Sequence, residues 1–193
     1  MKKISLILAL LALLIPSTAL AHNIGGNGVL SGLTHPLFGP DHLLAMVAVG
    51  VISTILGGKA VYKVPATFIG FMLAGGIIGM MGISLFGVEI AIALSVLLLG
   101  AAIALNKKVP NLLAMLFVAI FAVFHGHAHG AEMPLISNAT LYVIGFITST
   151  AFLHVSGVLI GHFAKKTQIT NGILRFAGAG IGIIGLTFLI NTF

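Results

Sequence analysis

The sequence has no cysteine and very little charge, and each absence excludes a class of protein. Without cysteine neither a disulfide framework nor a thiolate metal site can form, so a bound metal would need nitrogen, oxygen or thioether ligands. Charged residues make up 6% of the 193 residues, whereas roughly 25% is usual in a soluble domain. The mean hydropathy is +1.23. These values exclude a soluble surface and predict a chain that mostly faces lipid.

Two motifs are also missing. The sequence has no G-x-x-x-x-G-K-[ST] motif, so any transport would be driven by an ion gradient or by trapping rather than by ATP. It has no H-E-x-x-H motif either, and its histidine spacing differs from that of membrane desaturases. The formal charge is +6, but the basic residues occur singly or in pairs between apolar runs. That pattern argues against nucleic acid and is typical of loops that set membrane orientation.

The N-terminus has the pattern of a secretory signal peptide. Lys2 and Lys3 precede a short apolar core over residues 4–15, and Ala19-Leu20-Ala21 forms an A-x-A cleavage site. The alternative is an uncleaved first transmembrane helix, but the core is shorter than the ~20 residues that a span needs. We predict that residues 1–21 are removed and that residues 22–193 form the mature domain, with His22 outside the cytoplasm.

The rest of the chain predicts an all-α membrane protein with six spans in the bacterial inner membrane. The apolar runs predict helices at residues 32–56, 65–85, 89–105, 110–126, 139–162 and 172–191, each near the length that crosses ~30 Å of hydrocarbon. The basic residues of the mature chain fall in or beside the first, third and fifth connections: Lys59, Lys63, Lys107, Lys108, Lys165, Lys166 and Arg175. The positive-inside bias then places the N-terminus outside, in agreement with the signal peptide.

Residues 35–42 (HPLFGPDH) bring polar groups to the start of the first span. The apolar run after them, residues 43–56, is too short to span alone, so part of the polar segment is expected at membrane depth. Its prolines and glycine predict a broken or late-starting helix of the kind that transporters use for ion sites. Asp41 and His42 should point ~100° apart on that helix, with Met46 one turn below His42. A polar helix start capped by Asp41 is the alternative.

Residues 124–132 (FHGHAHGAE) cover the end of the fourth span, predicted at 110–126, and the start of an expected connection over residues 127–138. In a helix His125, His129 and Glu132 share one face, whereas in an extended segment His125, His127 and His129 do. Both geometries gather ligands, and neutral imidazole suits Zn, Cu, Fe and Ni. A solvated histidine-rich loop is the alternative.

Other polar residues carry weaker signals. His154 lies in the middle of the fifth span, where it could be a ligand along a path or a packing residue bonded to a carbonyl. His162 lies at a helix end, where a cation is favoured without any further role. Glu89 begins the third span and could either cap the helix or belong to a site. Met46, Glu89 and His154 are therefore the candidates for a translocation path.

Topology brings the two clusters together. The first span begins outside and the fourth ends outside, so the candidate ligands share the outward half: His22, His35, Asp41, His42, His125, His127, His129 and Glu132. Ionisable groups at membrane depth are costly and are functional candidates for that reason. A capture site on the outer face predicts uptake of a metal rather than efflux.

The two clusters resemble those of the HupE/UreJ family of hydrogenase and urease accessory membrane proteins. The matching stretches are residues 35–46 (HPLFGPDHLLAM) and 125–134 (HGHAHGAEMP), and the signal peptide and six spans fit the same family. The resemblance implies import of nickel, or less often cobalt, for a nickel enzyme, with cytoplasmic maturation proteins as candidate partners. It matches His35, Asp41, His42, His125, His127, His129 and Glu132 to the motif residues of the family.

Two other functions compete with transport. One is an intramembrane metalloenzyme, which the missing H-E-x-x-H motif and the outward position of the clusters disfavour. The other is a metal sensor or chaperone that does not transport, although no large soluble domain accompanies the membrane part. Copper and zinc would compete with nickel at a nitrogen-rich site, so only the family resemblance favours nickel.

Overall fold

The computed structural model describes residues 28–133 and 138–193, and every regular element within these ranges is a helix. The predicted signal peptide, residues 1–21, and His22 lie outside the described residues. The helices are α2 (Gly28–Phe38), α3 (Pro40–Leu56), α4 (Ala60–Met80), α5 (Val88–Leu105), α6 (Asn111–Ala131), α7 (Ala139–Ala164) and α8 (Gln168–Ile190). Five of them are long and apolar enough to cross a membrane, and α2 with α3 makes a sixth if the bent pair forms one span. The predicted all-α membrane architecture is confirmed.

The predicted break in the first span lies at Gly39. Helices α2 and α3 meet there at 83°. Pro40 is the first residue of α3, where its missing N–H costs no hydrogen bond. A proline also drives the residue before it away from helical backbone, and Gly39 is extended with φ −87° and ψ 104°. The chain therefore turns sharply just before Asp41 and His42.

The largest departures from the predicted helix boundaries are in α4 and α6. Helix α4 begins at Ala60 rather than 65 and ends at Met80, because Gly82, with φ +72°, turns the chain out of the helix. Helix α6 continues to Ala131, through the histidines that were expected in a connection. The apolar pattern ends at residue 126, but packing against α4 extends the helix past that point. The extended geometry for these histidines is thereby excluded.

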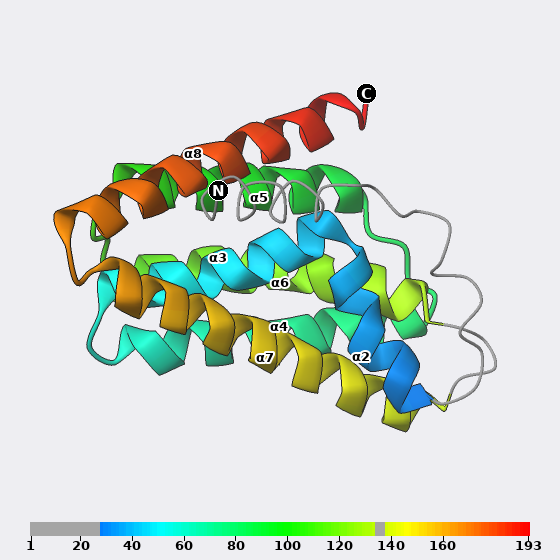
Figure 1. The fold of residues 1–193 in the computed structure, drawn as a ribbon. Helices are drawn as coiled ribbons and strands as arrows, with labels where there is room; N and C mark the ends of the chain where they lie inside the picture. The colour runs from blue at the N-terminus through cyan, green and yellow to red at the C-terminus, as the bar shows by residue number, and fades with distance from the viewer. Residues whose placement is uncertain (1–27, 134–137) are drawn as a thin grey trace, which may run out of the picture.

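The helices run side by side, and their connections lie at two ends of the bundle (Figure 1). The connections α3–α4, α5–α6 and α7–α8 lie at one end, which we call the lysine end because Lys59, Lys107, Lys108, Lys165 and Lys166 lie in or directly beside them. Helices α4 and α5, and α6 and α7, are joined at the opposite end, which we call the histidine end. Helix α2 also lies there, against the first half of α7.

Close backbone contacts pair the helices as α4 with α6, α5 with α8, and both α2 and α3 with α7. Glycines make each contact: a Cβ added at Gly126 would lie 1.8 Å from the Met72 carbonyl oxygen, and one at Gly50 would lie 2.1 Å from the His154 carbonyl oxygen. Small residues let helices approach closely in a membrane, where the hydrophobic effect does not drive them together. The glycines thus fix the position of α6 and α7, which carry most of the histidines.

Two basic side chains close helix ends at the lysine end. The Lys165 ammonium donates a hydrogen bond to the Thr54 carbonyl near the end of α3. The Arg175 guanidinium donates one to the Ala104 carbonyl of α5, with 2.8 Å between Nε and the oxygen. Cations are favourable at helix C-termini. Burial, with a smaller contribution from Lys108, lowers the pKa of Lys165 from its ordinary value.

Candidate metal centre

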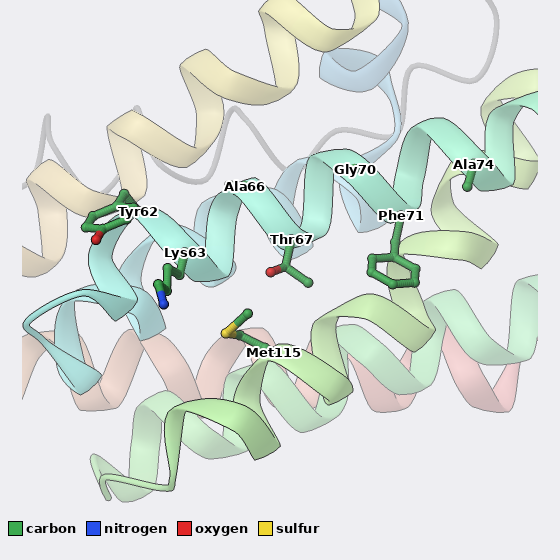
Figure 2. Close-up of a pocket in the computed structure, with 8 residues that line it drawn as sticks. All are labelled: Tyr62, Lys63, Ala66, Thr67, Gly70, Phe71, Ala74 and Met115. Atoms are coloured by element: carbon green, nitrogen blue, oxygen red, sulfur yellow. The ribbon is translucent and has the colours of Figure 1, made fainter.

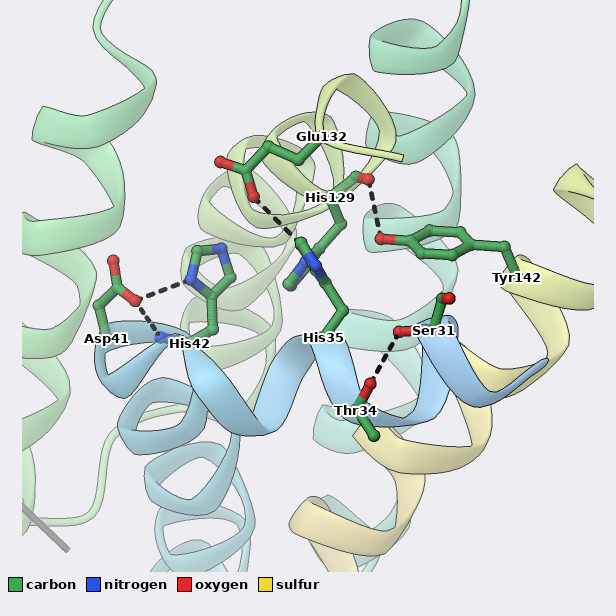
Figure 3. A network of polar contacts seen from close by, with 8 residues as sticks. All are labelled: Ser31, Thr34, His35, Asp41, His42, His129, Glu132 and Tyr142. Carbon is green, nitrogen blue, oxygen red and sulfur yellow. Dashed lines mark hydrogen bonds and ion pairs between the residues drawn. The ribbon is translucent and has the colours of Figure 1, made fainter. Parts of the chain in front are cut away.

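The two polar clusters of the sequence meet at the histidine end (Figure 3). Helix α2 contributes His35, the start of α3 contributes His42, and α6 contributes His125 and His129. The ring centroids of His42 and His129 are 4.2 Å apart, those of His42 and His125 4.9 Å, and those of His35 and His129 4.8 Å. Four imidazoles from three helices therefore form one contiguous cluster, which we call the histidine cluster.

Asp41 orients His42 rather than facing a different side, as the helical angle had predicted. The Asp41 carboxylate accepts hydrogen bonds from the His42 backbone N–H at 2.8 Å and from its Nδ1 at 2.9 Å. The side chain folds back over the helix start, because the free N–H groups of a first turn attract a carboxylate. With its Nδ1 proton donated, His42 keeps the Nε2 lone pair free. A metal-ligating histidine commonly donates its second N–H to a carboxylate in this way.

His125 has the complementary arrangement. The Ser95 hydroxyl on α5 donates to the Ile92 carbonyl at 2.7 Å and lies 2.9 Å from His125 Nε2. Since the single hydroxyl proton is already used, Nε2 must donate, and the lone pair of His125 is on Nδ1. This Nδ1 is buried without a hydrogen-bond partner in the described part of the chain. Ser95 thus fixes the tautomer that presents a free nitrogen.

His129 lies at the centre of the cluster. Its side chain is 2% exposed, and neither ring nitrogen has a hydrogen-bond partner among residues 28–133 and 138–193. Tyr142 on α7 donates to the His129 backbone carbonyl at 3.1 Å and so holds the end of α6 in place. An unpaired buried polar group is costly. His129 is also in ring contact with two other imidazoles, those of His35 and His42, so it is a candidate metal ligand.

An ion pair closes the outer edge of the cluster. His35 Nε2 lies 3.1 Å from Glu132 Oε2, joining α2 to the residue that ends α6. The hydrogen bond from His35 holds the pKa of Glu132 below its ordinary value, although partial burial acts in the opposite direction. Glu132 therefore stays ionised at neutral pH and places negative charge beside the imidazoles.

The remaining predicted site residues are placed differently. His127 points away from the cluster, with its Nε2 2.7 Å from the Ile83 carbonyl in the connection after α4. Glu89, in the first turn of α5, is exposed and interacts electrostatically with Asp41 and His42. Met46 is fully buried one turn inside His42. Helix α6 thus places His125 and His129 on the shared face and His127 on another.

Sequence patterns did not indicate Ser95 and Tyr142. Both sit in apolar helices, where an isolated hydroxyl carries no recognisable signal. Their roles follow only from the packing of α5 and α7 against α6. Serine at a helix position most often bonds its own backbone, as Ser95 also does.

The histidine cluster is not arranged as a finished coordination sphere. In the described ranges, 28–133 and 138–193, no three histidine or acidic side chains converge around one point in metal-binding geometry. The rings instead pack edge against face, with the interplanar angle between His42 and His125 at 87°. These rings would have to rotate about their side-chain bonds before their nitrogens could face a single ion.

A groove of about 650 Å³ lies elsewhere, on the outside of the bundle between α4 and α6 (Figure 2). Its lining residues are Tyr62, Lys63, Ala66, Thr67, Gly70, Phe71, Ala74 and Met115. None of them belongs to the histidine cluster. The groove is open and almost wholly apolar, which fits a surface that contacts acyl chains.

The fold and the site together define a polytopic helical membrane protein with imidazole and carboxylate groups gathered at one end of its bundle. The profile of the HupE / UreJ protein family matches residues 9–188. Protein HupE of Rhizobium leguminosarum bv. viciae is 45% identical over 193 residues, an overlap covering 98% of this chain and 100% of that protein. This chain belongs to the HupE/UreJ family, as the two motifs indicated. No solved structure matches the chain significantly.

Proposed function

We propose that this protein imports a divalent transition metal, nickel in the first place and cobalt in the second, across the bacterial inner membrane. The observation that carries the proposal is the histidine cluster, in which buried nitrogens of His42, His125 and His129 have no hydrogen-bond partner in the described part of the chain. Membership of the HupE/UreJ family supports a role in supplying metal to hydrogenase or urease.

Capture begins with the negative charge at the histidine end. Asp41, Glu89 and Glu132 are the only acids of the chain, and all three lie there. Carboxylates attract a hydrated cation and offset part of the cost of removing its water. The predicted N-terminal His22, with its free α-amino group, would add a chelate at the same end after cleavage.

Binding then transfers the ion to neutral nitrogen ligands. The free nitrogens of His42 and His125 are fixed by Asp41 and Ser95, so these rings need little reorganisation before ligation. His129 completes the cluster from its centre, and His35 with Glu132 closes it from outside. Met46 and His154 lie deeper and are the proposed continuation toward the lysine end.

The direction of transport rests on the charge distribution. The described loops at the histidine end contain no lysine or arginine, whereas the connections at the lysine end do. The positive-inside bias places the lysine end in the cytoplasm and the histidine cluster outside. A ligand cluster at the outer end favours uptake over efflux.

The test is metal uptake by the purified protein in proteoliposomes, with Ni²⁺, Co²⁺, Zn²⁺ and Cu²⁺ added singly and in competition. We expect Ni²⁺ to enter and Co²⁺ to compete. Copper binds nitrogen ligands more strongly than nickel, and zinc also accepts imidazole ligands. Competition by these ions without entry would indicate a selective transport step. Stoichiometric Ni²⁺ binding with no uptake would contradict transport and favour an accessory metal-binding protein.

A further inference from the structure

The rings at the histidine end belong to a longer series of contacts that reaches the middle of the bundle. Beyond His125 the series continues to Phe68 on α4, with 5.6 Å between ring centroids, and from Phe68 to His154 on α7, with 5.2 Å. Phe68 is 1% exposed and lies between the two imidazoles. A single apolar ring thus separates the histidine cluster from one further histidine.

His154 has no structural partner that accounts for its presence. Its side chain is 2% exposed, and both ring nitrogens are buried without a hydrogen-bond partner in the described part of the chain. Its backbone carbonyl packs against Gly50 of α3, which fixes the depth of the ring. A leucine at this position would bury a similar apolar surface without leaving two polar atoms unpaired. Packing alone therefore does not explain a histidine here.

A thioether, that of Met72, lies one helical turn from Phe68, the ring that contacts His154. Phe68 and Met72 share one face of α4, and Thr150 and His154 share one face of α7, each pair one helical turn apart. Phe68 contacts His154, and the Thr150 hydroxyl donates a hydrogen bond to Met72 Sδ at 3.7 Å. The two faces therefore oppose each other, with Met72 against Thr150 and Phe68 against His154. Imidazole and thioether are both ligands for late transition metals.

We propose that His154 is a second, deeper binding station for the transported metal ion, with Met72 as its thioether neighbour and Phe68 as the ring that separates it from the histidine cluster. This inference rests on the proposed import function. The station is neutral, since all the acids of the chain lie at the histidine end. It therefore binds a divalent ion more weakly than the cluster does. Weak binding is what a transient station requires, because the ion must also leave.

The test compares two variants of nearly equal volume, His154→Leu and His154→Met, in Ni²⁺ uptake by proteoliposomes. Leucine and methionine fill similar space, but only methionine supplies a donor atom. We expect His154→Leu to lower the maximal uptake rate about tenfold with the apparent KM within about twofold of wild type, and His154→Met to keep several times more activity. Thermal stability of His154→Leu should equal or exceed that of wild type. Equal uptake rates in the two variants, at any level, would overturn the proposal, as would an apparent KM raised as much as by His129→Ala.

A binding measurement separates this inference from the import function itself. If the wild-type protein does not import Ni²⁺, import is refuted, and equilibrium dialysis of the detergent-solubilised protein decides the deeper station. We then expect wild type to bind one more Ni²⁺ at saturation than His154→Leu. Equal stoichiometry would refute the station as well.

Discussion

The two ends of the bundle differ in both charge and hydrogen bonding. At the lysine end, Lys165 and Arg175 donate to helix-terminal carbonyls, and these contacts explain the positions of both side chains. At the histidine end, buried imidazole nitrogens are left without partners in the described part of the chain. Buried polar groups that serve only to stabilise a fold usually have hydrogen-bond partners within that fold. This difference supports the proposal that charge at the lysine end sets orientation and caps helices, whereas the histidine end binds a ligand.

Removal of the carboxylate that orients His42 is expected to have the largest effect on Ni²⁺ uptake. Asp41→Asn leaves the size of the side chain but removes its charge, and His42→Ala removes the ligand that Asp41 orients. We expect each variant to lose roughly a hundredfold or more of Ni²⁺ uptake, because a buried ion that loses its charged partner is strongly destabilised. Uptake is measured in proteoliposomes at equal protein incorporation.

Asp41→Glu is the matched control, since it keeps the charge, and it should retain part of the activity. Wild-type uptake in a well-expressed Asp41→Asn/His42→Ala double variant would show that the motif only starts the helix. The mechanism proposed here would then be wrong.

Acid should act on the histidine end alone. An ordinary imidazole titrates near pH ~6.5, and at pH ~5.5 only about a tenth remains neutral and able to bind metal. The pKa of Glu132 is lowered below its ordinary value of 4.5, so this carboxylate stays ionised over the same range and its pairing is lost only at more acidic pH. We therefore expect uptake to fall as the external pH drops below the ordinary imidazole value of ~6.5. A flat profile would argue against imidazole capture.

Two histidines of helix α6 allow a direct comparison within the histidine end. His129 lies in the cluster, and neither of its ring nitrogens has a hydrogen-bond partner among residues 28–133 and 138–193. His127 instead donates to the Ile83 carbonyl and faces another side of α6. We expect His129→Ala to raise the apparent KM for Ni²⁺ about tenfold, and His127→Ala to change it by no more than about threefold. Both variants add a similar void, so each serves as the packing control for the other. A larger effect at His127 would relocate the site toward the connection after α4.

Orientation is tested by positions whose substitution should leave uptake unchanged. Phe86, in the connection between α4 and α5, is 98% exposed, and Lys107 lies in the connection between α5 and α6. Because the chain has no cysteine, Phe86→Cys and Lys107→Cys each introduce a single thiol. A membrane-impermeant maleimide should label the first from outside intact cells and the second only after lysis. Labelling of both from outside would overturn the topology and the direction of transport.

The all-helical membrane fold, the approximate spans and the break near Gly39 could all be predicted from the sequence. Hydropathy and the backbone restrictions imposed by proline are local properties, so the order of the residues is enough to predict them. The alternation of six spans, which brings the start of the first and the end of the fourth to the same side, also predicted one group of ligands. Its members are His22, His35, Asp41, His42, His125, His127, His129 and Glu132. His127 contacts the Ile83 carbonyl instead, and His22 lies outside the described residues.

The contacts that these side chains make with one another depend on the tertiary structure. Helix α6 continues past its apolar pattern because it packs on α4 through glycine contacts, and this extension turns His127 away from His129. Three contacts could not be predicted from the spacing of residues in the sequence. They are the hydrogen bond from His42 to Asp41, the contact of Ser95 with His125 and the packing of Phe68 against His154. Side-chain direction and cross-helix contacts depend on packing, which no single segment of the sequence specifies.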